Sequence, residues 1–157
     1  MIMVRRLCFA FAFFTTIAHA ADWPQFQRDA SRAGDAAQET LRFPLGIDAQ
    51  IQLDDAILTS PAIVDGKVFV VDQMGKAYAL DPVQRKILWT SHPDGDDARG
   101  ANTSSPCVVH GRMIFGTTAG TLHVLDVRDG KTIKSLRLGW PITGSVAFAN
   151  DSIYFQT

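Results

Sequence analysis

The chain has 157 residues, of which 46% are hydrophobic and 20% are charged, and its formal net charge is −1. This length and composition are typical of one ordinary globular domain. A chain without a basic excess has little with which to neutralise phosphates, so we do not expect nucleic acid to be a partner.

The first twenty residues have the pattern of an export signal. The basic pair Arg5-Arg6 precedes an apolar run over Leu7–Ala18, and Ala18-His19-Ala20 fits the small-x-small rule for signal-peptidase cleavage. The run is shorter than the ~20 apolar residues that cross a bilayer. We therefore predict a signal peptide over 1–20, cleaved after Ala20, no membrane-spanning segment after cleavage, and a periplasmic or extracellular location. Both the general secretory and the twin-arginine routes stay open.

Residues 21–57 are the predicted N-terminal lead. It opens with Asp22-Trp23-Pro24-Gln25-Phe26, a polar stretch that carries two aromatics of the kind usually buried. From Ile47 to Leu53 apolar and polar residues alternate, which predicts a half-buried strand.

The rest of the chain repeats itself. Moving Leu58–Ser91 forward by 45 positions places it on Thr103–Leu136 without a gap, and a third copy begins near Thr143. A period of ~40–45 residues is typical of stacked-repeat architectures such as the β-propeller. We predict repeats over 58–102 and 103–142, and an incomplete one over 143–157.

Each repeat is expected to form a meander of four short strands. In the first copy Asp65-Gly66 separates two apolar runs, a strong hairpin signal because both residues tolerate positive φ. Val68–Val71 and Met113–Phe115 are apolar without alternation, which predicts strands covered on both faces. A propeller blade meets that condition because it lies between two neighbours. The predicted fold is all-β, a partial β-propeller with two full four-stranded antiparallel blades and part of a third.

These repeats resemble the pyrroloquinoline-quinone (PQQ) repeat of quinoprotein-like β-propellers. That repeat has turn glycines, an apolar strand that ends Leu-Asp, a Gly-Lys turn and a strand that ends in Trp. The matching positions are Gly66, Gly75, Asp81 and Trp89 in the first copy, and Gly111, Gly120, Asp126 and Gly130 in the second. Asp22–Phe26 looks like the opening segment of exported bacterial members.

Two positions depart from the pattern. Arg85 replaces a turn glycine, and Lys134 stands where Trp89 stands in the first copy. The resemblance implies that this Trp packs between adjacent blades, so Lys134 predicts a weaker junction and a more exposed outer strand. Because ring closure needs at least four blades of ~40–45 residues, we also expect the chain to be an N-terminal fragment of a longer propeller.

A meander places alternate turns at the same end of a blade. Residues 72–76, 92–102, 117–121 and 138–142 are therefore expected to share one end, which we call the loop face. Since loops on a rigid scaffold are where binding concentrates, we place any binding surface for a protein or ligand there. Trp140 in this set would stack on a planar ligand or fill a gap between blades, and we expect the second.

Few residues suggest metal or catalytic chemistry. Asp94, Asp96 and Asp97 are carboxylates of the kind that hold Ca²⁺, but they lack the spacing of a calcium loop, so we expect a solvated turn. His110 is expected to be exposed in a turn and His123 to be packed in a strand, with no ligand partner at metal spacing. No Ser-His-Asp set can be argued, because no serine lies in a Gly-x-Ser-x-Gly elbow.

The only cysteine beyond the signal is Cys107, at the position of Ala62 in the first copy, and we expect a small buried side chain there. Two functions remain. The favoured one is a non-catalytic exported scaffold without a cofactor in this chain. The alternative is a fragment of a PQQ-dependent quinoprotein dehydrogenase, whose PQQ and Ca²⁺ would need an intact ring.

Overall fold

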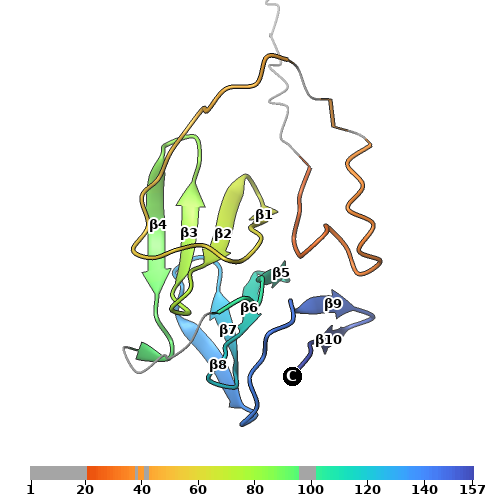
Figure 1. The fold of residues 1–157 in the computed structure, drawn as a ribbon, viewed down its shortest axis with the longest axis vertical. Coiled ribbons are helices and arrows are strands. Elements are labelled where there is room, and N and C mark those ends of the chain that lie inside the picture. The colour runs from red at the N-terminus through yellow and green to blue at the C-terminus, as the bar shows by residue number, and fades with distance from the viewer. Residues whose placement is uncertain (1–20, 38, 41–42, 96–101) are drawn as a thin grey trace, which may run out of the picture.

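The computed structural model describes residues 21–37, 39–40, 43–95 and 102–157. The signal predicted over 1–20 lies outside these residues. In the described part, three antiparallel sheets follow one another around a common axis (Figure 1). Blade 1 is β1 (Ala62–Val64), β2 (Lys67–Val71), β3 (Ala77–Asp81) and β4 (Lys86–Ser91). Blade 2 is β5 (Cys107–Val109), β6 (Arg112–Gly116), β7 (Thr121–Asp126) and β8 (Thr132–Arg137). Blade 3 has β9 (Ala147–Ala149) and β10 (Ser152–Tyr154).

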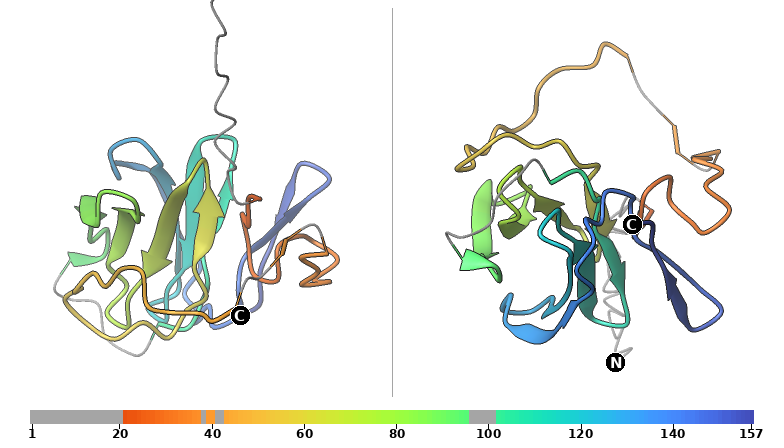
Figure 2. Two further views of the ribbon diagram at one scale, coloured as in Figure 1. Left: turned by 90° about the horizontal axis from the view of Figure 1, so that it is seen from above. Right: turned by 60° about the horizontal axis from the view of Figure 1, so that its bottom comes forward.

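The strand order in each sheet follows the chain, as in a meander. The predicted all-β partial propeller, with two full blades and part of a third, is therefore confirmed, and Figure 2 shows the blades fanning out from their first strands. The first strands β1, β5 and β9 contact one another from blade to blade, so they form the inner edge of the fan. No helix in the described ranges is long and apolar enough to cross a membrane.

The first hairpin of each blade turns as the sequence predicts. Asp65 and Gly66 have φ of 51° and 69°, and His110 and Gly111 have φ of 49° and 70°. Positive φ at both central residues is the condition for a tight two-residue hairpin turn. In blade 3 Asn150-Asp151 meets the same condition without glycine, because short polar side chains tolerate this region.

The second strands are covered on both faces, as predicted. Met113 and Phe115 pack toward blade 1, and Ile114 between them packs with Val146 toward blade 3. The split follows from the alternation of side chains along a strand. Blade 2 therefore contributes one face to the core with blade 1 and the other face to the core with blade 3.

Trp89 closes the outer part of the junction between blades 1 and 2. Its ring nitrogen donates to the carbonyl of Val127 at 2.8 Å, and its ring lies where a Cβ on Gly130 would be, 2.5 Å from the nearest ring carbon. Lys134, at the equivalent position of blade 2, is exposed, and so is every residue of β8. The interblade Trp and the more exposed second outer strand are both as predicted.

The predicted strand over 47–53 is wrong. Ile51 and Leu53 are half-buried against Val70 and Tyr78 of blade 1, and Gln52 between them is exposed, so this part of the segment alternates as expected, although Ile47 is 92% exposed. Their backbone, however, belongs to no strand. Alternation reports which side chains are buried, and an extended segment can bury one side on a blade without a neighbouring strand to pair with.

Candidate functional site

The predicted loop face forms one connected surface. The amide of Asn102 donates to the carbonyl of Gln73 at 2.8 Å, which ties the segment before blade 2 to a turn of blade 1. The amide of Ile142 donates to the carbonyl of Thr117 at 3.0 Å, which links the segment before blade 3 to a turn of blade 2 in the same way. These backbone bonds hold turns from successive blades in fixed relative positions.

Gly120 permits a close approach between the backbones of two of these turns. Its φ is +81°, and a Cβ there would lie 2.9 Å from backbone atoms of Trp140. The Trp140 side chain itself is 71% exposed, so the expected role of filling a gap between blades is wrong. The backbone of Trp140 packs on Gly120 while its indole faces outward. Met74 and Leu138 are also exposed, so this face offers apolar side chains on a rigid base.

The Asp72 turn is organised from within. Asp72 is buried, and its Oδ1 accepts from the amides of Met74 and Lys76 while its Oδ2 accepts from the Tyr78 hydroxyl at 2.8 Å. Burial, followed by this hydrogen bond to a carboxylate, raises the pKa of Tyr78 well above its ordinary value. Because three donors already bond to the Asp72 carboxylate, this group stabilises the turn and is not free to bind a ligand.

An open cavity of about 280 Å³ adjoins this turn. Its lining residues are Asp54, Asp55, Asp72, Met74, Lys76 and His92. Lys76 pairs with Asp54, and this contact lowers the pKa of the Asp54 carboxyl. Because Asp54 and Asp72 are already engaged, the cavity does not present a set of free oxygens to a cation. Within the described ranges no three His, Cys, Asp or Glu side chains converge as a metal site would require.

Asp94, one of the carboxylates considered for Ca²⁺, is engaged by blade 2. Its Oδ2 accepts from the Thr117 hydroxyl at 2.9 Å, and its Oδ1 lies 2.9 Å from Nε2 of His123. The Oδ1 contact lies off the direction of a ring N–H bond, so it is an ion-pair contact when the imidazole is protonated and not a hydrogen bond. Asp96 and Asp97 lie outside the described residues.

The structure brings together a Ser-His-Asp set that sequence reasoning missed. Nδ1 of His123 lies 2.9 Å from Oγ of Ser135, opposite to it on β8, and Nε2 faces Asp94. The sequence could have indicated the His123–Ser135 contact, because the β7–β8 hairpin places these two residues opposite each other. Nothing in the sequence indicated the contact with Asp94, because Asp94 comes from the loop before blade 2.

This set is better explained as a clamp than as a catalytic triad. His123 is packed as predicted, at 1% exposure, and its ring lies 5.4 Å from the Phe115 ring in the core. The imidazole joins the outer strand of blade 2 to the loop that arrives from blade 1. His110 is exposed, as predicted, in its turn.

Two further polar groups are fully enclosed near the loop face and the axis. Asn102 is 2% exposed, and among the described residues neither its Nδ2 nor its Oδ1 has a hydrogen-bond partner. The equivalent position 40 residues later is the apolar Ile142. Cys107 is buried as predicted, and burial raises the pKa of its thiol to about 11. The Cys107 thiol is therefore poorly suited to act as a nucleophile. The buried Asn102 amide, by contrast, has donors and an acceptor that a bound water or ligand could use.

Four-stranded blades stacked by their faces, with tight turns at one end and longer loops at the other, define a β-propeller repeat protein. A family model described as "Outer membrane protein assembly factor BamB" matches residues 49–154, which is 106 of the 157 residues. The chain belongs to this family, and the resemblance to PQQ-repeat propellers is confirmed.

Relatives of the chain include two curated dehydrogenases. "Quinohemoprotein alcohol dehydrogenase ADH-IIG" of Pseudomonas putida is 22% identical over 66% of this chain and 16% of its own length. "1-butanol dehydrogenase (cytochrome c)" of Thauera butanivorans is 32% identical over 47% of this chain and 12% of its own. The chain thus spans less than a fifth of the length of either relative.

The fold is also that of a solved dehydrogenase. The quinohemoprotein alcohol dehydrogenase from Comamonas testosteroni superposes with a TM-score of 0.65 at 18% identity, over 87% of this chain and 23% of that one. At this identity the likeness establishes the shared propeller fold.

Proposed function

We propose that this protein is an exported, non-catalytic propeller scaffold that binds a protein partner through its loop face. The observation that carries the proposal is the pair of interblade backbone bonds, Asn102 to Gln73 and Ile142 to Thr117, which fix the loops of successive blades as one surface. Trp140, Leu138 and Met74 supply exposed apolar side chains on it. Aromatic and Met side chains on a rigid base are typical of protein interfaces. The family description, an assembly factor, agrees with a binding role.

Photo-crosslinking tests this proposal. A photoreactive amino acid replaces Trp140 on the loop face in one variant and Asp151, in the tight turn at the opposite end of blade 3, in another. The proposal predicts a discrete crosslinked protein from position 140 and none from position 151 in cells that export the chain. Equal yields from both positions, or none from position 140, would contradict it. Fractionation of the same cells tests whether the chain is exported. If it is, the exported fraction should contain a mature chain that begins at Ala21.

The second candidate is a segment of a PQQ-dependent dehydrogenase, which the two dehydrogenase relatives favour. Among the described residues, the buried Asn102 amide without a partner is one group that could contact a bound cofactor. Purified full-length protein, with its ring complete, is mixed with PQQ and Ca²⁺ and passed through gel filtration. Quinone absorbance that stays with the protein would support this candidate and count against the scaffold. Loss of the quinone would count against the dehydrogenase.

A further inference from the structure

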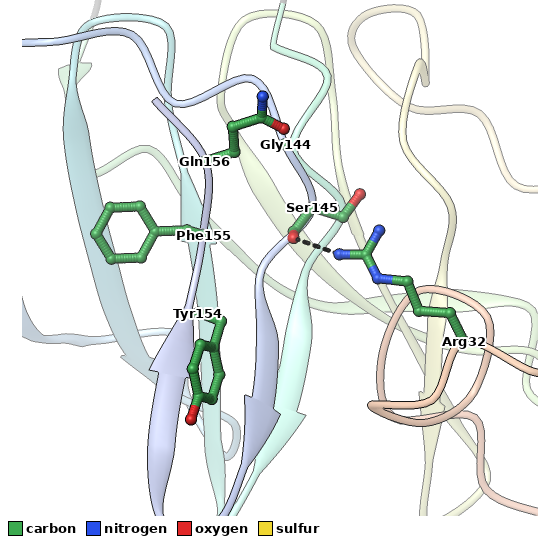
Figure 3. A pocket seen from close by; sticks show the side chains of 6 residues that line it. All are labelled: Arg32, Gly144, Ser145, Tyr154, Phe155 and Gln156. Atoms are coloured by element: carbon green, nitrogen blue, oxygen red, sulfur yellow. Dashed lines mark hydrogen bonds between the residues drawn. The ribbon is translucent and has the colours of Figure 1, made fainter.

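A separate cavity lies between the N-terminal lead and blade 3 (Figure 3). It has a volume of about 260 Å³, and its lining residues are Arg32, Gly144, Ser145, Tyr154, Phe155 and Gln156. Arg32 reaches in from the lead, and the others belong to β10 and the segments that flank blade 3 (Figure 3). The loop-face proposal makes no use of this cavity.

The Arg32 guanidinium is held in place without being neutralised. Its central carbon lies 5.6 Å from the centroid of the Phe26 ring, within cation–π range. Its Nη2 donates to the Ser145 carbonyl at 3.4 Å, a long hydrogen bond (Figure 3). Within the described ranges no carboxylate lies at ion-pair distance from Arg32. A guanidinium has five N–H donors, so most of them remain available.

The rest of the lining provides polar and apolar groups. The Ser145 hydroxyl oxygen accepts from the amide of Ser105 at 3.4 Å, which leaves its own proton free to be donated. Tyr154 and Gln156 add a hydroxyl and an amide, whereas the Phe155 ring projects to the side of the chain away from Arg32 (Figure 3). An open site with one cation, the Ser145 hydroxyl and the Tyr154 ring suits a small anionic ligand with an apolar body.

We propose that this cavity binds a small organic carboxylate. The planar guanidinium of Arg32 and the Ser145 hydroxyl hold the carboxylate, and Tyr154 contacts the body of the ligand. One cation next to aromatic side chains matches the single charge of a carboxylate better than the double charge of phosphate. The site is independent of the loop face, so either proposal can fail while the other holds.

Isothermal titration of the exported chain with benzoate, benzamide and inorganic phosphate tests the proposal. Benzamide has nearly the same shape as benzoate but no charge. A charge-assisted hydrogen bond contributes ~1.5–3 kcal/mol, so benzoate is expected to bind at least about tenfold more tightly than benzamide. No saturable benzoate binding, or equal binding of the two compounds, would overturn the proposal. Phosphate that binds as tightly as benzoate would overturn the assignment to carboxylates.

Arg32→Gln and Arg28→Gln form the matched pair of variants. Arg28 also lies in the lead, but its guanidinium donates to the Asp35 carbonyl and does not line the cavity. Arg32→Gln is expected to weaken benzoate binding at least about tenfold, and Arg28→Gln to leave it within about twofold. Arg32→Lys, which keeps the charge and loses the planar fork, should lie between wild type and Arg32→Gln. Circular dichroism melts of all three verify folding, and an equal loss in Arg28→Gln and Arg32→Gln would contradict the assignment.

Discussion

The side-chain oxygen of Gln25 accepts a hydrogen bond from the backbone amide of Phe148 at 2.8 Å, although 123 residues separate them. Trp23 and Ile63 exchange backbone hydrogen bonds of 2.7 and 2.8 Å, and the Pro24 carbonyl accepts from the Val108 amide at 2.7 Å. Positions 63, 108 and 148 are equivalent in the three repeats, with offsets of 45 and 40 residues. Three consecutive lead residues therefore bind the inner edges of three consecutive blades.

Gln25→Ala is expected to destabilise the fold. The substitution leaves the partly buried Phe148 amide without its acceptor and removes the contact with the Cys107 thiol at 3.7 Å. An unsatisfied buried donor costs ~1–3 kcal/mol. Urea unfolding measures the change, with Gln52→Ala as the control because Gln52 is exposed and bonds only to the neighbouring Leu53 carbonyl. Equal losses in the two variants would show that the Gln25 contact is not stabilising.

Gly130→Ala is expected to lower stability more than Gly139→Ala. Both glycines have positive φ, +70° and +82°, so the two variants should lose similar free energy of unfolding from backbone strain. A Cβ at Gly139 meets nothing within 4 Å, whereas a Cβ at Gly130 meets the Trp89 ring at 2.5 Å. The steric part should add ~1–3 kcal/mol in a urea or thermal unfolding experiment. Matching unfolding midpoints would mean that Trp89 moves aside without loss.

The Asp94–His123 contact is expected to couple the loop before blade 2 to that blade. A double-mutant cycle with Asp94→Ala and His123→Ala should give a coupling free energy of ~0.5–3 kcal/mol, because the two groups are in contact and partly buried. The control cycle uses Asp48 and Arg85, which lie 3.8 Å apart with both side chains well exposed. That pair should give a coupling near zero. A coupling at Asp94–His123 no larger than in the control cycle would rule out the clamp.

The Cys107 thiol is expected to be unreactive in the folded protein. With its pKa raised to about 11 by burial, about one molecule in a thousand carries the thiolate at pH 8. In a Cys8→Ser background, an aromatic disulfide reagent should label native protein at least a hundredfold more slowly than protein unfolded in urea, by the same thiolate argument. Labelling at the unfolded rate would show that the junction between blades 2 and 3 opens readily.

The Asp126 carboxyl is expected to titrate near pH 2. Its hydrogen bond from the Arg128 side chain, followed by that from the Arg128 amide, lowers its pKa to about 2. Because the folded pKa lies below the unfolded value of ~3.9, the associated stability is present above pH ~4 and is lost as the pH falls toward 2. An NMR titration should place the midpoint near 2 in wild type and closer to 3.9 in Arg128→Ala. An unchanged midpoint in the variant would assign the shift to another group.

The turns and the burial of the blades could be predicted from the sequence because their causes are local. Asp65-Gly66 and His110-Gly111 carry residues that accept positive φ, and the unbroken apolar run of β6 needs cover on both faces. The same local reasoning failed at 47–53. Alternation correctly indicated that Ile51 and Leu53 are half-buried, but it could not indicate that Ile47 is exposed or whether a strand lay beside the segment.

The amino-acid order alone determined the repeat period and the hairpin turns, since each depends on residues that are neighbours in the chain or recur from repeat to repeat. The family resemblance predicted the interblade role of Trp89, whose partner Val127 lies in the next repeat. Only the tertiary structure decided that Gln25 meets Phe148, that Asp94 faces His123, and that Arg32 lines a cavity beside Ser145. Those contacts join segments from different blades and the lead. They depend on how the blades are rotated about the axis, and that rotation is set by the packing of whole faces rather than by any local pattern.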